Sequence, residues 1–205
     1  MKTSVMLIDD HAIMRMGLKS ILGTCEDIEV VADAEGGEEA VECVLSKRPD
    51  VVVMDLMMPE MDGAEMSRRI LSEWPEAKIL ILTTFGTADA IGHTLDAGAK
   101  GALMKNAKFE ELVAAIKSVA AGGRHVAPEI EKMLSEEPPI PELSQRQLEV
   151  LQLVSRGLTN EDIARLFGIS LAMVKEHIQL TFAKIGAANR AEAVAIALRK
   201  HLLKI

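Results

Sequence analysis

The sequence predicts a doubly wound α/β domain with a five-stranded parallel sheet, followed by a small all-α domain of four helices. In the first part of the chain, short apolar runs alternate with longer amphipathic segments, which is typical of βα repeats. Residues 51–54 and 79–82 are apolar without interruption, as expected of parallel strands that helices cover on both faces. Every periodic segment after residue 143 instead has helical spacing.

The first domain is expected to span residues 1–122 and to contain five strands, each followed by a helix. The strands are expected at 4–8, 29–32, 50–54, 78–82 and 101–104, and the helices at about 11–23, 37–47, 63–73, 87–98 and 108–121. Repeats of this length form one doubly wound sheet, in which functional groups gather beyond the carboxyl ends of the strands.

A linker is expected at 123–142, between the two domains. Gly122 and Gly123 end the last helix of the first domain, because glycine interrupts helices. Prolines then recur at Pro128, Pro138, Pro139 and Pro141. The pattern allows a short helix over 129–134, whereas 136–142 is typical of an extended connection.

Capping residues mark the helices of the second domain, which is expected to span 143–205. We expect four helices with the N-caps Ser144, Thr159, Ser170 and Asn189, which end at about Arg156, Gly168, Ile185 and Leu203. The short turn between the second and third of these helices contains a glycine, as in a helix-turn-helix.

Charge separates the two domains. The chain is 49% hydrophobic and 26% charged, as in ordinary globular proteins, and its net charge of −8 taken alone argues against a nucleic-acid partner. Residues 143–205, however, carry nine basic and five acidic side chains, a net charge of +4, which leaves −12 for the remainder. The sequence therefore joins an acidic domain to a basic one that is compatible with DNA.

The sequence gives no support for a membrane-spanning protein or for a secreted one. No apolar run approaches the roughly 20 residues that a membrane-spanning helix needs, and the N-terminus lacks a signal-peptide pattern. We therefore expect a cytoplasmic protein with no membrane partner. The two cysteines, Cys25 and Cys43, lack metal-ligand spacing and are expected to be packing residues.

Acidic side chains follow two of the predicted strands. Asp9 and Asp10 come after the first strand and Asp55 after the third, so their carboxylates are expected to converge at one edge of the sheet. Three carboxylates repel one another unless a cation neutralises them, and Mg²⁺ prefers such oxygen ligands. Thr83 and Lys105 end the fourth and fifth strands. A carboxylate nucleophile, a metal, a hydroxyl group and a lysine are the parts needed to accept a phosphoryl group.

Four segments carry a resemblance to the receiver domain of two-component response regulators, which has a flavodoxin-like fold. They are VMLIDDHAIMRMGL (5–18), PDVVVMDLMMPEMDG (49–63), KILILTTF (78–85) and DAGAKGALMKNA (96–107). By this resemblance, Asp55 accepts a phosphoryl group from a sensor histidine kinase, and Thr83 and Lys105 contact the phosphoryl oxygens. The resemblance implies a Mg²⁺ site formed by Asp9, Asp10, Asp55 and the main-chain carbonyl of Met57.

One position departs from many receivers. Ala102 stands where relatives carry an aromatic residue that rotates on activation, so the resemblance does not imply an aromatic relay from Thr83. We hypothesise that Phe85 supplies part of the missing aromatic surface. The departure also keeps open a phosphorylation-independent regulator, in which the receiver is only a dimerisation scaffold.

The third helix of the second domain has a core face and a polar face. Its core face is expected to contain Val174, Ile178, Thr181 and Ile185, which recur at helical spacing. Lys175, Glu176 and Gln179 lie off that face. The second helix of a helix-turn-helix enters the major groove, where Gln179 could pair with adenine, Glu176 with cytosine, and Lys175 with guanine or phosphate.

Residues 143–198 resemble the LuxR-type helix-turn-helix along their whole length, with departures that include Gln147, where the family usually has Glu. We expect Lys184, near the end of the third helix, to contact phosphate. The resemblance adds Asn160 and Ser170 to the expected DNA contacts. It also implies a dimer contact on the last helix, where the apolar stripe consists of Ala191, Val194, Leu198 and Leu202. Two interpretations remain open for this stripe, because it is either an exposed seam or part of the domain's own core.

Together, the two resemblances identify the chain as a NarL/FixJ-type response regulator rather than an enzyme. Such a protein binds promoter DNA and is expected to be a homodimer when phosphorylated or on DNA. The alternative of a haloacid-dehalogenase-type phosphatase requires Asp-x-Asp after the first strand, where this chain has Asp9, Asp10 and His11. That alternative also leaves the basic second domain unexplained.

Overall fold

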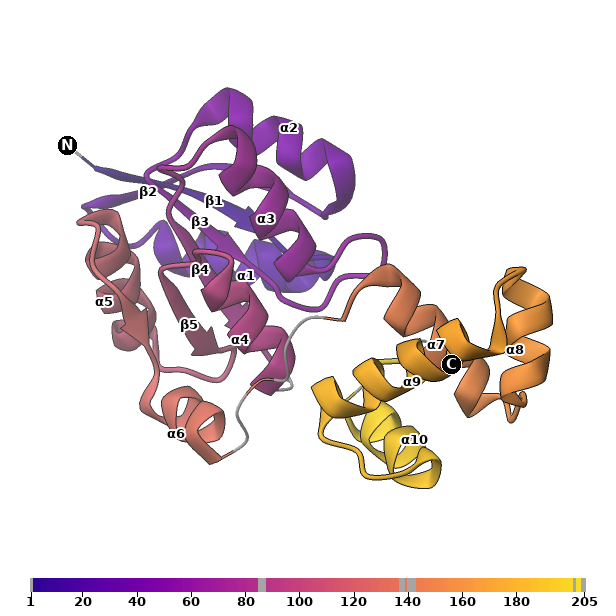
Figure 1. Cartoon of the computed structure of the whole chain (residues 1–205). Helices are drawn as coiled ribbons and strands as arrows, with labels where there is room; N and C mark the ends of the chain where they lie inside the picture. Colours follow the sequence, from indigo (N-terminus) through magenta and orange to yellow (C-terminus); the bar gives the residue numbers. More distant parts are fainter. Residues whose placement is uncertain (1, 85–87, 137–138, 140–142, 201, 204–205) are drawn as a thin grey trace. The chain divides into compact units, whose positions relative to one another are not determined.

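The computed structural model describes residues 2–84, 88–136, 139, 143–200 and 202–203. The chain divides into two compact units, Met1–Pro139 and Ile140–Ile205 (Figure 1). The hypothesis about Phe85 concerns a position outside the described residues.

The first unit contains a parallel sheet with the strand order β2-β1-β3-β4-β5-β6. The strands are β1 (Thr3–Ile8), β2 (Ile28–Ala34), β3 (Val51–Met54), β4 (Ile79–Thr83), β5 (Gly101–Met104) and β6 (His125–Val126). The predicted doubly wound α/β fold is confirmed, with five main strands and a short sixth.

Helices cover both faces of this sheet. They are α1 (Ala12–Leu22), α2 (Gly37–Lys47), α3 (Gly63–Glu73), α4 (Ala88–Asp96), α5 (Phe109–Ala120) and α6 (Pro128–Glu136). Figure 1 shows α3 and α4 on the near side of the sheet and α1 behind it. Because both faces are covered, residues 5–8 of β1, all of β3 and residues 79–82 of β4 are apolar and buried without alternation.

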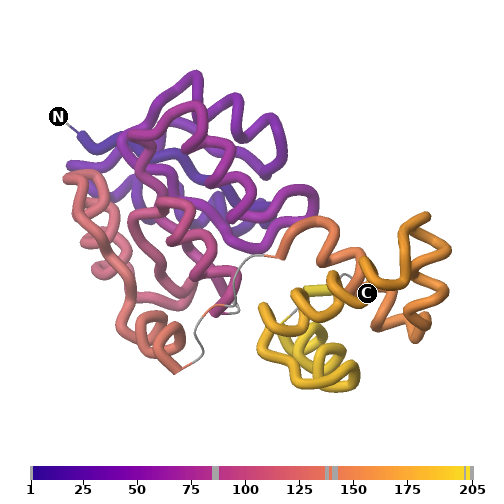
Figure 2. The backbone as a smooth tube through the Cα atoms, viewed as in Figure 1, coloured from indigo at the N-terminus to yellow at the C-terminus, as the bar shows by residue number. Residues whose placement is uncertain are grey.

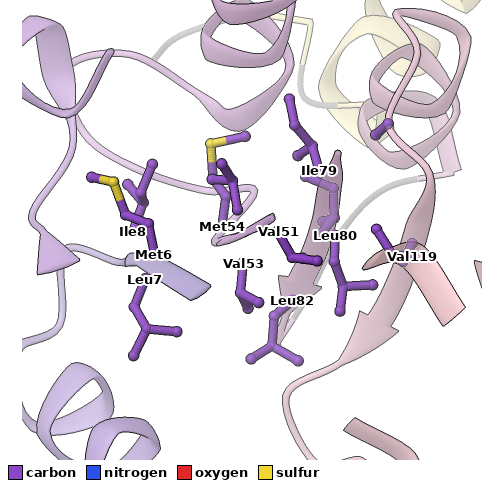
Figure 3. Close-up of a cluster of buried hydrophobic side chains, with 14 of the residues drawn as sticks. Met6, Leu7, Ile8, Val51, Val53, Met54, Ile79, Leu80, Leu82 and Val119 are labelled. Carbon is purple, nitrogen blue, oxygen red and sulfur yellow. The ribbon is translucent and has the colours of Figure 1, made fainter. Parts of the chain in front are cut away.

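The core of the first unit lies on both faces of the central strands. Leu7, Val53 and Leu82 point to one face, and Met6 and Met54 point to the other (Figure 3). All five side chains are buried. The residues that follow these strands are thereby held at fixed positions along one edge of the sheet.

Most of the segment expected as a linker, 123–142, instead packs on the first unit. After α5 the backbone continues through β6, which pairs with β5, into α6, which packs against α4 and β5 (Figure 2). Ala127 and Ile130 are fully buried there. A strand of two residues and a helix of nine show too little periodicity to be recognised as core elements, and burial of these two side chains decides their placement.

The second unit consists of four helices: α7 (Gln145–Ser155), α8 (Asn160–Phe167), α9 (Leu171–Ile185) and α10 (Arg190–Arg199). The predicted N-caps Ser144, Thr159, Ser170 and Asn189 are confirmed, since each side chain accepts a hydrogen bond from the third backbone N–H of its helix. Gly168 and Gly186 end α8 and α9 at positive φ, where glycine is favoured. The last helix ends near Arg199 rather than Leu203.

No helix among the described residues is long and apolar enough to span a membrane.

Candidate functional site

Three carboxylates converge at the carboxyl edge of the sheet. Asp9 follows β1 and Asp55 follows β3, and these neighbouring strands are paired with Ile8 opposite Met54. One possible ligand atom from each of Asp9, Asp10, His11 and Asp55 lies within 4.8 Å of the others. Asp9 and Asp55 are only 3% and 4% exposed. The expected convergence is therefore present, and His11 joins the cluster without having been singled out from the sequence.

Lys105 bridges two of these carboxylates. Its Nζ lies 2.6 Å from Asp9 Oδ2 and 2.7 Å from Asp55 Oδ2, and all three side chains are buried. Burial lowers the pKa of Lys105, but hydrogen bonds from its ammonium group to Asp55 and Asp9 outweigh burial and raise the pKa above its ordinary value. The lysine therefore remains charged and offsets part of the carboxylate repulsion.

Thr83 contributes a buried hydroxyl group at the same edge. It is the last residue of β4, which lies between β3 and β5, and it is fully buried. Within the described part of the chain, its Oγ1 has no hydrogen-bond partner. A buried polar group without a partner costs about 1–3 kcal/mol, so this hydroxyl is available to an oxygen atom of a bound group.

The donor set fits a hard divalent cation. Carboxylate oxygens are the ligands that Mg²⁺ prefers, and three carboxylates gather here, of which Lys105 pairs with two. Asp10 Oδ1 is buried and accepts no hydrogen bond from the described residues, although His11 Nδ1 lies 2.8 Å away. The backbone N–H of Met57 donates to Asp55 Oδ1 at 3.3 Å, which orients that carboxylate.

Ala102 is fully buried in β5, between Ile81 of β4 and Val126 of β6. At the position where many receivers have an aromatic residue, this chain therefore has only the buried methyl group of an alanine. The edge strand β6, which supplies Val126, was not predicted from the sequence, because two residues carry no alternation.

In the second unit, α9 presents a polar face to solvent. Lys175, Glu176 and Gln179 are exposed, whereas Val174 and Thr181 are buried, as predicted from helical spacing. The exposed side of the same helix also carries two large apolar side chains, Met173 at 48% and Leu180 at 54% exposure. Leu180 was not singled out from the sequence, since an apolar residue in a helix usually indicates core.

Of the other residues expected to contact DNA, Ser170 and Lys184 have hydrogen-bond partners within the unit, and Asn160 lies at the start of a helix. Ser170 accepts a hydrogen bond from the backbone N–H of Met173 at 3.3 Å, and Lys184 Nζ donates to Gln147 Oε1 at 3.1 Å. The same Gln147 oxygen accepts from the backbone N–H of Ser144. Asn160 is half-buried as the first residue of α8.

The apolar stripe of α10 is neither wholly an exposed seam nor wholly part of the core. Ala191 and Leu198 are exposed, and Leu198 keeps 45% of its accessible surface. Val194 and Leu202 instead pack against the core of the unit. The stripe is therefore partly core and partly open surface.

Comparisons with known proteins agree with this arrangement. The model of the response regulator receiver domain matches residues 5–117, and the model of the bacterial regulatory proteins of the LuxR family matches residues 141–197. The chain belongs to the two-component response regulators with a LuxR-type DNA-binding domain. It is a response-regulator transcription factor rather than an enzyme, which sets aside the phosphatase alternative.

Similar proteins span almost the whole response regulator. The oxygen regulatory protein NreC of Staphylococcus epidermidis is 36% identical over 215 residues, which cover 98% of this chain and 99% of NreC. The crystal structure of ChrA, a response regulator in a heme-sensing two-component system, is 38% identical, with a TM-score of 0.59 and coverage of 98% and 99%. A structure of two RcsB dimers bound to two parallel DNAs is 24% identical, with a TM-score of 0.65 and the same coverage; this likeness concerns the fold.

Proposed function

We propose that this response regulator is a transcription factor switched by phosphorylation of Asp55, with a sensor histidine kinase as phosphoryl donor. One observation carries the proposal: Lys105 holds the buried Asp55 carboxylate, while the buried Thr83 hydroxyl at the end of the neighbouring strand β4 has no hydrogen-bond partner among the described residues. A lysine on this carboxylate and a free hydroxyl at the same edge of the sheet are suited to contact two oxygens of an incoming phosphoryl group.

The chemistry follows from these positions. A carboxylate oxygen of Asp55 forms a bond to phosphorus while the bond from phosphorus to the kinase histidine nitrogen breaks, and the nitrogen leaves with the electron pair. Lys105 then shifts part of its interaction from the carboxylates to the phosphoryl oxygens, and Thr83 donates a hydrogen bond to another oxygen. Both interactions draw the ends of β4 and β5 toward Asp55, which shifts a conformational equilibrium of this edge.

A Mg²⁺ ion belongs to this proposal. Asp9, Asp10, Asp55 and the main-chain carbonyl of Met57 would hold the ion, since they are oxygen donors at one edge of the sheet. When bound, Mg²⁺ neutralises negative charge on the phosphoryl oxygens during transfer.

For the second unit, we propose that α9 enters the major groove of promoter DNA. Its exposed Glu176 and Gln179 would contact base edges, and Lys175 would contact guanine or phosphate. Asn160, Ser170 and Lys184 would contact the DNA backbone, which fixes the orientation of the helix without choosing sequence. Because Ser170 and Lys184 already have partners in the unit, their contacts to phosphate would be held in place.

The proposal assigns receiver function to 1–122 and DNA binding to 143–205, and it includes a homodimer when the protein is phosphorylated or on DNA. The exposed Leu198 of α10 supports a contact between two copies. Because both DNA and a kinase's phosphohistidine are cytoplasmic, the proposed location is the cytoplasm.

The test uses DNA selected from a random pool by the full-length chain, so the DNA sequence that the protein prefers is found in the same experiment. We expect acetyl phosphate to add one phosphoryl group to the wild type and none to Asp55→Asn, as measured by intact mass. Beryllofluoride, which mimics the phosphoryl group, is expected to tighten DNA binding of the wild type only. Asp96→Asn is the matched control, because it removes an exposed carboxylate of α4 and should behave as wild type.

Equal DNA affinity with and without beryllofluoride, in the wild type and in Asp55→Asn, would reject control by phosphorylation. That outcome favours the phosphorylation-independent regulator, for which the buried Ala102 is the specific observation.

A further inference from the structure

Arg15 is a buried arginine one turn into α1, the helix that follows Asp9, Asp10 and His11 in the chain. Its side chain is 11% exposed, so the guanidinium group needs hydrogen-bond acceptors inside the protein. It has three: Nη1 donates to the main-chain oxygen of Asp9, Nε to Asp33 Oδ2 at 3.3 Å, and Nη2 to Glu35 Oε1 at 2.9 Å. Nothing in the proposed phosphoryl chemistry requires these contacts.

The contact with Asp9 fixes the main chain at the start of the segment that joins β1 to α1 and carries Asp10 and His11. The backbone N–H of Asp9 donates to the carbonyl of Ala34 at the end of β2, and its carbonyl accepts from Arg15. Arg15 is in turn held by Asp33 and Glu35 at the same end of β2. Both sides of the Asp9 main chain are thus tied to β2, although its carboxylate points toward Asp55 and Lys105 on the other side of β1.

We propose that Arg15 is a positioning residue for the metal site. By holding the Asp9 carbonyl, it sets the direction of the loop that carries Asp10 and His11, so that the carboxylates of Asp9 and Asp10 converge before a cation binds. Outer contacts of this kind strengthen metal binding because the ligands need no rearrangement. The inference rests on the proposed function, since it assumes that the cluster binds Mg²⁺.

Charge and geometry predict opposite changes in Mg²⁺ affinity when Arg15 is replaced. A positive charge near a cation site weakens cation binding, so loss of that charge would strengthen binding. In this structure the guanidinium is already paired with Asp33 and Glu35, so its net effect on a nearby cation is small. Loss of the hydrogen bond to Asp9 then dominates, and Mg²⁺ binding is expected to weaken.

The experiment measures the Kd of Mg²⁺ alone for the full-length protein, from backbone amide chemical shifts in an NMR titration. Arg15→Met keeps the length of the side chain but removes the charge and all donors, and its Kd is expected to rise about tenfold. Arg15→Lys keeps the charge and loses the planar fork, and its Kd is expected to rise by a smaller factor of about three. Arg15→Lys also keeps the test decisive if Arg15→Met does not fold.

Lys19→Met is the matched control, because Lys19 also pairs with Asp33, at 2.7 Å, but has no hydrogen bond to Asp9 in the described structure. Its Kd is expected to stay within about twofold of wild type, since this exposed pair is solvent-screened. Unchanged or tighter Mg²⁺ binding in a folded Arg15 variant overturns the inference, and so does an equal effect of Lys19→Met. If the wild type itself binds no Mg²⁺, the metal part of the proposed function fails instead.

Discussion

The two candidate sites of this response regulator are built in opposite ways. At the carboxyl edge of the sheet, buried side chains from the ends of different strands hold one another, as Lys105 holds Asp9 and Asp55. On α9, the side chains proposed to contact DNA come from one helix and lie in solvent, as Lys175 and Gln179 do. In the first site, function and stability therefore depend on the same contacts. In the second, the two can be changed separately.

The largest expected effect is that of Lys105→Met. The substitution leaves two buried carboxylates facing each other without their cation, and breaking a buried ion pair in this way costs about 3–5 kcal/mol. We expect the free energy of unfolding of the metal-free first unit to fall by about that amount. Urea unfolding followed by fluorescence measures it, because Trp74 is the single tryptophan of the chain and lies in the first unit.

The pH dependence of this effect has a definite sign. The pKa of Lys105 is raised in the folded protein, so its contribution to stability is fully present below the ordinary value of 10.5 and is lost as the pH rises through the folded pKa. The difference in stability between wild type and Lys105→Met should persist at neutral pH and shrink in strong alkali, where Lys105 loses its proton. Lys100→Met changes an exposed lysine near β5 and should leave stability within about 0.5 kcal/mol.

The second prediction concerns the exposed site. Gln179→Ala is expected to weaken binding to the selected DNA by about 1–3 kcal/mol and to relax base preference at one position, because a base-edge contact is lost. Lys184→Ala should instead weaken binding to all sequences. It should also reduce the slope of the logarithm of the binding constant against the logarithm of the salt concentration by about one, as expected when one phosphate contact is lost. Fluorescence anisotropy at several salt concentrations distinguishes them.

The comparison between the sites requires that Gln179→Ala leave thermal unfolding of the second unit unchanged within about 0.5 kcal/mol. A large loss of stability in this variant would show that the α9 face is coupled to the core as the buried site is.

A smaller effect is expected where β1 meets the start of β3. The Ser4 hydroxyl donates to Asp50 Oδ2 at 2.7 Å, and hydrogen bonds from the Ser4 backbone and side chain hold the pKa of Asp50 below its ordinary value of 3.8. We expect Ser4→Ala to lower the free energy of unfolding by about 1 kcal/mol at neutral pH. A lowered carboxyl pKa stabilises above the unfolded value of 3.8 and loses this effect as the pH falls through the folded pKa, so the difference between the two proteins should shrink below pH 3.8.

An effect of similar size is expected for Ser170, which has a structural role and a proposed DNA contact. Ser170→Ala removes the N-cap of α9 and should cost about 1 kcal/mol, whereas Ser170→Asp restores the cap and places a negative charge beside the DNA phosphates. Circular dichroism and DNA titration together separate the roles. If Ser170→Asp binds DNA as tightly as wild type, Ser170 is a cap and not a phosphate contact.

Much of the candidate site was predictable because strand ends of a parallel sheet meet at one edge. Asp9, Asp55, Thr83 and Lys105 each follow or end an apolar run, and that position alone placed them together. Arg15 was not predictable in this way. Its importance arises from burial and from a hydrogen bond to a main-chain oxygen, and neither leaves a pattern in the sequence.

The sequence by itself determined the fold class, the capping residues and the polar face of α9, because each depends on local spacing and local hydrogen bonding. The tertiary structure alone decided that Lys105 reaches a carboxylate 50 residues away, that Arg15 ties Asp9 to β2, and that β6 and α6 pack on the first unit. Those contacts depend on strand order and register between segments far apart in the chain, which no local pattern specifies.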